Sequence, residues 1–416
     1  MKISHSFKSA WKTLRIPDKP RSGQIKAITS ILNRQDTLVV APTSFGKSAI
    51  YLVPAIVNNS KDKWTLVIEP TLPLIADQVN KLQELGISAE MLTSRNRDEH
   101  SSILNNLSKG NITVLYVTPE RLQTVEFLSA VKGNPPWLVA VDEAHCVLDW
   151  GYTFRPAYLG IQSFIMELKH RPVIAAFTAT APPEYRGAIC NHLGMKEPTI
   201  FTVSLERSNI ILLKEDCFDL DIKKRLSRVK YNIKKYRRDG RVVVYCATRK
   251  NVDIVANYLT KQFPGEVVKC HAYMDTEKRE KHEMQFINGS KPIIVATTAF
   301  AMGISVPDIR LVLHFNLPLS TIDYYQQIGR AGRDGKKSHA MLLYQPDDIE
   351  LNHHILKKED LSDETQECLS HRLDEMVSIA ESDQCLMQQL LRALGEEHPK
   401  TCRHCTNCQK ARRTEK

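Results

Sequence analysis

The segment Thr37–Ser48 joins an apolar run to a loop of small residues that leads into a helix. Backbone N–H groups in such a loop surround a phosphate, and the dipole of the following helix attracts the same charge. We expect Lys47 to place its ammonium against the β- and γ-phosphates and Ser48 to offer a hydroxyl to Mg²⁺. The other loop residues expected to bind the nucleotide are Thr43, Ser44 and Gly46. Ala41 replaces the first glycine of this motif, so a chance Gly-Lys-Ser is the alternative interpretation.

A second group of reactive side chains follows the apolar run Leu138–Val141. Asp142 can hold Mg²⁺ through water, and Glu143 can orient or deprotonate an attacking water. We count His145 with this catalytic group. An acidic N-cap on a helix is the alternative interpretation. Because water would be the nucleophile, the two segments together predict an ATPase or GTPase rather than a kinase.

Four of the ten cysteines form a third group, with the spacing Cys385-x16-Cys402-x2-Cys405-x2-Cys408. Thiolates at x2 intervals favour tetrahedral zinc bound by four sulfurs. The alternatives are His404 in place of one thiolate, or a redox-active pair. We expect Cys385 in the first turn of a helix and the other three in the terminal loop. The metal is expected to stabilise a module too small for a core of its own.

The elements that must position these residues are visible as short continuous apolar runs that alternate with helical stretches. Such runs fit strands buried on both faces of a parallel sheet, and the alternation predicts an α/β fold. The expected strands are Thr37–Ala41, Thr65–Glu69, Val114–Val117, Leu138–Val141, Val173–Phe177, Val242–Cys246, Ile293–Ala296, Leu311–Phe315 and Ala340–Tyr344. The expected helices include Gly23–Asn33, Ile75–Leu85 and Asn251–Lys261.

The alternation pauses at Val203–Asp221, which places a domain boundary near residue 205. A basic helix is expected next, because Lys223–Arg241 holds ten Lys or Arg against Asp239 alone and has an apolar stripe at helical spacing. A solvated surface is the simpler interpretation of its basic face, and a binding site is the alternative.

Residues 361–394 are predicted to be helical, with an N-cap at Ser382 or Asp383 and a helix end at Gly395. The predicted domains are therefore 1–205 and 206–348, both α/β, and 349–416, a small helical zinc-binding module with a basic tail.

Composition excludes several classes of protein. The 416 residues are 42% hydrophobic and 25% charged, which is ordinary for a globular chain and not for a disordered one. No run approaches the roughly 20 apolar residues of a membrane span, and the N-terminus lacks a secretory signal. We therefore expect an intracellular protein, cytoplasmic or nucleoid-associated in a bacterium and nuclear in a eukaryote. The net charge of +10 suits a polyanionic partner, although simple solubility would also explain it.

Further motifs form an ordered set across residues 15–408. They are Arg21-Ser-Gly-Gln24, Thr118-Pro-Glu-Arg-Leu122, Phe177-Thr-Ala-Thr-Ala181, Val244-Tyr-Cys-Ala-Thr-Arg249, Ala296-Thr-Thr-Ala-Phe-Ala-Met-Gly303 and Gln326-Gln-Ile-Gly-Arg-Ala-Gly-Arg-Asp-Gly335. With the two segments above, this set resembles the superfamily 2 helicases and most closely the RecQ family. The resemblance implies two RecA-like domains that bind ATP and Mg²⁺ between them. It also implies 3′–5′ DNA helicase or translocase activity on single-stranded and forked DNA, in repair or recombination.

The resemblance also assigns roles to residues. Gln24 is expected to read the adenine edge, with Arg21 stacked on the adenine face. Arg330 and Arg333 are expected to reach the γ-phosphate from the second domain, sharing one face of a helix, with Arg333 as the arginine finger. The remaining residues expected at the nucleotide are Gly303 and Gln326.

The segment Cys146–Tyr158 resembles the aromatic-rich loop by which RecQ proteins sense single-stranded DNA and signal to the ATP site. Stacking of a base on an aromatic ring contributes about 1–3 kcal/mol and tolerates any sequence. The side chains expected to bind DNA are Trp150, Tyr152, Phe154 and Arg155. Trp150 and Phe154 are expected to be partly exposed and Tyr158 buried, and rings in the core are the alternative. RecQ proteins also carry zinc on cysteines spaced as in this chain.

The sequence departs from the family pattern at several places. Pro17 and Pro20 replace aromatic residues before Gln24, Ser44 replaces a glycine, and Tyr152 replaces a histidine. We expect a short form without winged-helix and C-terminal helical modules, so a protein partner for strand separation is one possibility. The alternatives to an autonomous helicase are a partner-dependent translocase, an ATP-gated scaffold and an RNA helicase. No membrane partner is expected.

Overall fold

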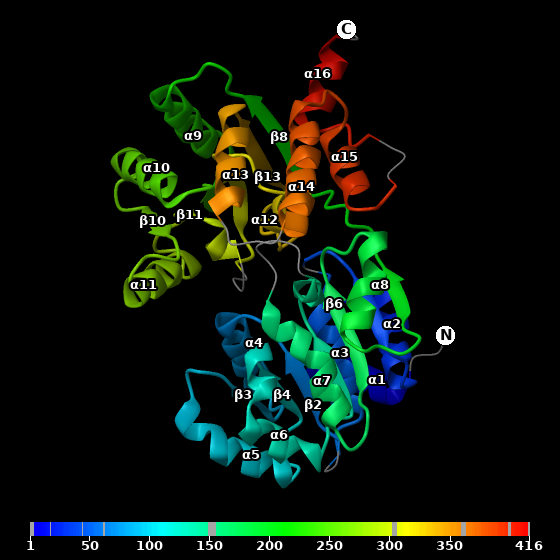
Figure 1. Cartoon of the computed structure of the whole chain (residues 1–416). Coiled ribbons are helices and arrows are strands. Elements are labelled where there is room, and N and C mark those ends of the chain that lie inside the picture. The colour runs from blue at the N-terminus through cyan, green and yellow to red at the C-terminus, as the bar shows by residue number, and fades with distance from the viewer. Residues whose placement is uncertain are drawn as a thin grey trace. The chain divides into compact units, whose positions relative to one another are not determined.

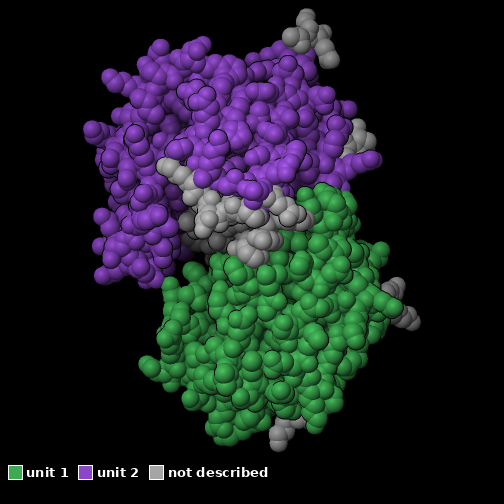
Figure 2. Space-filling view, in the orientation of Figure 1, with its two compact units in different colours: residues 1–204 green, residues 205–416 purple. Residues whose placement is uncertain are grey.

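The computed structural model describes residues 4–16, 18–43, 45–60, 63–148, 155–301, 306–358, 363–397 and 401–414. The chain forms two compact units, Met1–Ser204 and Leu205–Lys416 (Figures 1 and 2). Each unit is built on one parallel sheet. None of the helices in the described ranges is long and apolar enough to cross a membrane.

The first unit contains a seven-stranded sheet of order β3-β4-β2-β5-β6-β1-β7, in which all of the pairings are parallel. Its strands are β1 (Thr37–Val40), β2 (Thr65–Ile68), β3 (Ala89–Leu92), β4 (Val114–Val117), β5 (Leu138–Val141), β6 (Val173–Thr178) and β7 (Thr199–Thr202). The inner strands are fully buried, as their unbroken apolar runs predict.

Helices cover both faces of this sheet. One face packs against α1 (His5–Thr13), α2 (Ser22–Leu32), α3 (Lys47–Val57) and α4 (Leu72–Glu84). The opposite face packs against α5 (His100–Ser108), α6 (Val125–Lys132), α7 (Gly160–Glu167) and α8 (Pro183–His192). Short 3-10 helices lie at Arg97–Glu99, Pro119–Gln123, Ala144–Val147 and Pro156–Leu159.

The second unit contains a six-stranded parallel sheet of order β10-β11-β9-β12-β13-β8. Its strands are β8 (Ile210–Asp216), β9 (Arg241–Tyr245), β10 (Val267–Cys270), β11 (Ile293–Ala296), β12 (Ile309–His314) and β13 (Ser338–Tyr344). One face packs against α9 (Ile222–Tyr236) and α10 (Arg249–Gln262).

The opposite face of the second sheet carries most of the remaining helices. They are α11 (Thr276–Ile287), α12 (Thr321–Ile328), α13 (Asp347–Lys358), α14 (Asp363–Glu381), α15 (Leu386–Ala393) and α16 (Thr406–Thr414), with a 3-10 turn at Thr298–Ala301. The C-terminal helices share one apolar core with the strands, in which Leu373, Leu390 and Cys405 are fully buried. The structure thus groups residues 206–348 and the C-terminal segment into a single compact unit.

The nine strands predicted from apolar runs are all present, with ends shifted by at most two residues. Four strands were not predicted, and each is an edge strand: β3 and β7 in the first sheet, β10 and β8 in the second. An edge strand has a neighbour on one side only, so it needs fewer apolar residues. The expected pause at Val203–Asp221 was therefore wrong, because this segment contains β8. The expected N-cap at Ser382 or Asp383 was also wrong, since Cys385 precedes α15.

A buried ion pair joins α9 to α13 in the second unit. The side chains of Arg225 and Asp348 are 7% and 3% exposed, and their closest atoms, Nη2 and Oδ2, are 2.6 Å apart. Asp348 also accepts hydrogen bonds from the Asn316 side chain at 2.7 Å and from the Leu317 backbone N–H at 3.0 Å. Arg225 additionally donates to the carbonyl of Phe315. This network fixes α9 on the sheet.

We predict that Asp348→Ala lowers the free energy of unfolding by about 3–5 kcal/mol, because it leaves a buried guanidinium without its carboxylate. Asp77→Ala is the matched control, since Asp77 pairs with Lys81 on an exposed helix surface and such pairs contribute about 0–1 kcal/mol. Urea denaturation followed by circular dichroism measures both. Equal losses in the two variants would contradict the importance of the network.

Candidate nucleotide site and thiolate cluster

Strand order brings the reactive segments of the first unit together. The strands β2, β5, β6 and β1 are consecutive neighbours in the sheet. Because they are parallel, their carboxyl ends meet at one edge, where ligands bind in open α/β sheets. The residues that follow these strands are Glu69, Asp142, Thr178 at the end of β6 itself, and the loop 41–46.

The loop after β1 turns sharply into α3. Gly46 is the N-cap of α3 and has a φ of +83°, which favours glycine. A Cβ atom at Gly46 would lie 2.7 Å from Nε2 of Gln24, so the position also has no room for a side chain. Lys47 and Ser48 occupy the first turn of α3, and the Lys47 ammonium lies 3.5 Å from the carbonyl oxygen of Ala41. Thr43 is half-buried, and Ser44 lies outside the described residues.

Gln24 and Arg21 brace this loop from the start of α2. The buried amide of Gln24 donates to the carbonyl oxygens of Phe45 at 2.9 Å and Gly46 at 3.3 Å. Its oxygen accepts the Arg21 backbone N–H at 2.8 Å. The guanidinium carbon of Arg21 lies 5.3 Å from the ring centroid of Phe45. These contacts give both residues a role in shaping the loop, and their contact with adenine stays a prediction.

The segment after β5 forms a compact polar cluster. Asp142 is 8% exposed and accepts the backbone N–H of Glu143 at 2.9 Å. Glu143 has a φ of +47°, in the left-handed region that non-glycine residues seldom adopt. Nδ1 of His145 lies 3.0 Å from Oγ1 of Thr178 and 3.5 Å from a carboxylate oxygen of Glu143. His145 therefore joins the segment after β5 to the end of β6, a contact through Thr178 that the sequence analysis did not identify.

Acidic groups are crowded at this edge. Burial, and then the carboxylate of Glu143, raise the pKa of Asp142 to about 6, while the Lys47 ammonium opposes the shift. Burial, followed by the charges of Asp142 and Glu143, holds the pKa of Glu69 well above its usual range. A divalent cation favours oxygen ligands and would relieve this crowding. The donor set at Asp142 and Ser48 thus fits Mg²⁺.

The stem of the aromatic loop is tied to the same edge. Arg155 donates its backbone N–H to the Cys146 carbonyl at 3.1 Å and its guanidinium to the Pro70 carbonyl at 2.7 Å. The Tyr158 hydroxyl donates to the backbone carbonyl of Asp142 at 2.9 Å. Tyr158 is fully buried, as predicted. Trp150, Tyr152 and Phe154 lie outside the described residues.

The two arginines of the second unit were expected on a helix, and this expectation was wrong. The helix α12 ends at Ile328, so Arg330 and Arg333 lie in the turns that follow. Gly332 has a φ of +54°, and a Cβ atom there would lie 2.7 Å from the carbonyl oxygen of Lys336. Both arginines are half-buried, as is Gln326 on α12. Gly303 lies outside the described residues.

A residue that the sequence analysis missed holds this turn. Arg207 is buried, and its guanidinium donates to the carbonyl oxygens of Gly329 at 3.3 Å and of Ala331 and Gly332 at 3.1 Å each. These are carbonyls at and beyond the C-terminus of α12, where a cation is favourable. No motif marks Arg207, because its partners are more than 120 residues away in sequence.

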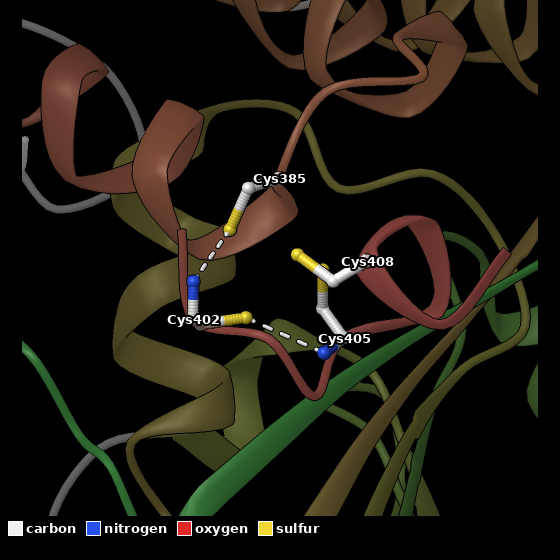
Figure 3. Close-up of side chains that lie close together, drawn as sticks. All are labelled: Cys385, Cys402, Cys405 and Cys408. Atoms are coloured by element: carbon white, nitrogen blue, oxygen red, sulfur yellow. Dashed lines mark hydrogen bonds between the residues drawn. The ribbon is translucent and has the colours of Figure 1, made fainter. Parts of the chain in front are cut away.

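The four predicted cysteines converge in the second unit (Figure 3). The sulfurs of Cys385, Cys402, Cys405 and Cys408 all lie within 4.8 Å of one another. Four thiolates around one Zn²⁺, at about 2.3 Å each, have sulfurs about 3.8 Å apart, so the cluster fits zinc. Within the described residues, this group contains cysteines alone and excludes the alternative ligand His404.

Backbone contacts prepare the sulfurs for a metal. The N–H of Cys402 donates to the Cys385 sulfur at 3.2 Å, and that of Cys405 donates to the Cys402 sulfur at 3.3 Å (Figure 3). Hydrogen bonds from the side chains of Cys402 and Cys405, together with the first of these N–H groups, lower the pKa of Cys385. Cys385 precedes α15, and Cys408 lies inside α16 rather than in a loop as expected.

Three family models match the chain in order. The DEAD/DEAH box helicase model matches residues 21–187, the helicase conserved C-terminal domain model matches residues 224–335, and the RecQ zinc-binding model matches residues 346–409. The last match covers the thiolate cluster.

Two curated relatives come from Bacillus subtilis. The chain is 36% identical over 395 residues to the ATP-dependent DNA helicase RecQ, covering 94% of this chain and 65% of that protein. It is 35% identical over 346 residues to the probable ATP-dependent DNA helicase RecS, covering 83% and 68%. The chain spans between 60% and 65% of the length of the bacterial RecQ relatives that it matches.

A solved structure shares the fold. Dbp5 of S. cerevisiae, bound to RNA and ADP BeF3, matches with a TM-score of 0.67 at 18% identity, over 89% of this chain and 98% of that one. At this identity the likeness concerns the fold alone, which confirms the prediction of two RecA-like α/β domains.

We predict that the purified, reduced protein contains about one zinc per chain, measured by elemental analysis. Cys405→Ser should lose the metal and lower the melting temperature, because it removes a fully buried thiolate from the cluster. Cys368→Ser is the control, since Cys368 lies on α14 outside the cluster. A folded, metal-free wild type would contradict the zinc assignment.

Proposed function

This chain belongs to the RecQ family of helicases, and we propose that it couples hydrolysis of Mg-ATP to 3′–5′ movement along single-stranded DNA. The observation that carries the proposal is the double attachment of the aromatic-loop stem. Tyr158 bonds to the backbone of Asp142, and Arg155 bonds to the backbone beside Glu69. A strand that displaces the loop would therefore act directly on the carboxylate edge.

Each group at this edge has a defined part in hydrolysis. Lys47 binds the β- and γ-phosphates, while Ser48 and Asp142 hold Mg²⁺, which when bound neutralises phosphate charge. Glu143 orients the attacking water and accepts its proton. His145 links that carboxylate to Thr178, so the water-activating group is held by two neighbouring strands.

The second unit supplies positive charge. Arg333 stabilises the charge that develops on the γ-phosphoryl group, with Arg330 beside it in the turn held by Arg207. An arginine finger contributes about 10³–10⁵ in rate in GTPases. Hydrolysis would then depend on the second unit reaching the nucleotide, and cycles of closure and opening would move the strand.

DNA is proposed as the substrate because the aromatic loop and the thiolate cluster distinguish this chain from RNA helicases that share the fold. Single-stranded and forked DNA, a role in repair or recombination and an intracellular location are part of the same proposal. A translocase that relies on a partner for strand separation is the second candidate, favoured by the partial coverage of the longer relatives.

We predict that Lys47→Ala lowers ATP hydrolysis by at least about 10²–10³, as removal of a preorganised charge does at other sites. Lys81→Ala, which removes an exposed lysine of a surface pair, should hydrolyse ATP at the wild-type rate. Steady-state phosphate release with single-stranded DNA, duplex DNA and RNA identifies the substrate. Stimulation by RNA and not by DNA would make the DNA assignment wrong.

We predict that Tyr158→Phe lowers the ratio of DNA-stimulated to basal ATPase several-fold, because it removes one hydrogen bond between the loop stem and Asp142 while keeping the buried ring. Tyr258→Phe, at a half-buried tyrosine on α10, is the control. The ratio is measured with saturating single-stranded DNA. An unchanged ratio would mean that this bond does not transmit the signal.

A further inference from the structure

The basic helix α9 is amphipathic, and the proposed function does not account for its exposed face. Its buried residues pack against the second sheet: Arg225, Leu226, Val229, Asn232 and Ile233. Its opposite side carries six cations that we call the basic face: Lys223, Lys224, Arg228, Lys230, Lys234 and Lys235. This face lies on the α9–α10 side of the sheet, whereas α12 and the thiolate cluster pack on the other side (Figure 1).

Few carboxylates neutralise the basic face. Arg228 pairs with Glu215, and Lys230 donates to the Gln262 side chain at 3.2 Å. Within the described residues, Lys223, Lys224 and Lys234 form no ion pair. The nearby acidic groups are otherwise engaged, since Asp221 caps the helix at the N–H of Lys224 and Glu266 pairs with Arg237. The face therefore keeps most of its positive charge.

An exposed tyrosine organises the cations. Tyr231 is 46% exposed, yet the Arg228 guanidinium carbon lies 4.8 Å and the Lys235 ammonium 5.4 Å from its ring centroid. Lys235 also lies 5.0 Å from the ring centroid of Tyr236. Such cation–π contacts reduce the freedom of long side chains and hold their charges in place. A ring already covered by cations offers little surface for stacking on a base.

We propose that the basic face of α9 binds the sugar–phosphate backbone of duplex DNA, as a second contact separate from the single-strand path. The proposal rests on the proposed function only in taking DNA as the polyanion. Lys224, Arg228, Tyr231 and Lys235 follow one another at intervals of four, three and four residues, so they form a straight row. The row spans about 16 Å at 1.5 Å per residue, which equals about five base pairs of duplex.

Charge and chemistry favour nucleic acid over an acidic protein. The core of a protein interface is depleted in lysine and enriched in apolar side chains, whereas the middle of this face is lysine with one cation-covered ring. A single strand is less suitable, because proteins bind it through free aromatic surfaces. A regular row of fixed cations matches the regular phosphates of a duplex.

The test is the salt dependence of binding of the full chain to a blunt duplex. Lys224→Gln/Lys234→Gln removes two exposed charges that have no partner side chain, so folding should be unaffected. The slope of log K against log[salt] should become less steep by about 0.9 for each lost contact, or about 2 in total. At about 0.1 M salt the affinity should fall roughly tenfold or more.

The control is Lys278→Gln/Lys281→Gln, which removes two exposed lysines from α11, where they alternate with Glu277 and Glu280. It should bind the duplex with the wild-type slope. If both double variants keep the wild-type slope, the proposal is wrong. It is also wrong if the α9 variant loses binding to polyglutamate while its duplex binding is unchanged, which would indicate an acidic protein partner.

Two further measurements separate this inference from the proposed function. Tyr231→Ala should weaken duplex binding; weaker single-strand binding with unchanged duplex binding would instead make the ring a stacking platform and overturn the assignment. ATPase stimulation by single-stranded DNA should be the same in the α9 double variant and the wild type. Absence of stimulation in the wild type contradicts the proposed function, whereas normal stimulation with an unchanged duplex slope contradicts this inference alone.

Discussion

Parallel pairing of neighbouring strands forces their polar carboxyl ends to one edge of the first sheet, and the chemistry of the first unit depends on this constraint. Without the order β2-β5-β6-β1, Glu69, Asp142, Thr178 and the phosphate loop would have no reason to meet. The adjacency has an electrostatic cost, because buried carboxyl groups repel one another and their pKa values rise. The Lys47 ammonium partly offsets that cost, and a bound cation would offset more.

The second unit separates its tasks by sheet face. One face carries α12, whose C-terminal turn presents two arginines, together with the helices that hold the thiolates. The other face carries α9 and α10, and α9 exposes its cations there. The ion pair between Arg225 and Asp348 contributes to both, since it connects the basic helix to α13 and to the loop after β12. A polyanion held on α9 would thus contact a helix that is firmly attached to the sheet.

Much of this organisation could be predicted from the sequence, and the omissions have physical causes. Continuous apolar runs predicted every inner strand, because burial on both faces leaves a strong local signal. The cysteine spacing predicted the cluster, because its ligands are close in sequence. The contacts of His145 with Thr178 and of Arg207 with the turn after α12 could not be predicted, since they join residues 33 and more than 120 positions apart. Helical spacing placed Arg330 and Arg333 on one face of a helix, but Gly332 adopts a conformation that ends helices.

The edge strand β8 has a consequence for the behaviour of the protein in solution. Its Lys214 backbone N–H donates to Oγ1 of Thr406 at 2.9 Å, and Asp216 at its end lies 3.7 Å from Lys410 of α16. The segment that carries Cys405 and Cys408 thus occupies hydrogen-bonding positions that an open strand would offer to another molecule. Chelation of the metal would uncover a template for intermolecular strand pairing, so the thiolate cluster also protects the protein from self-association.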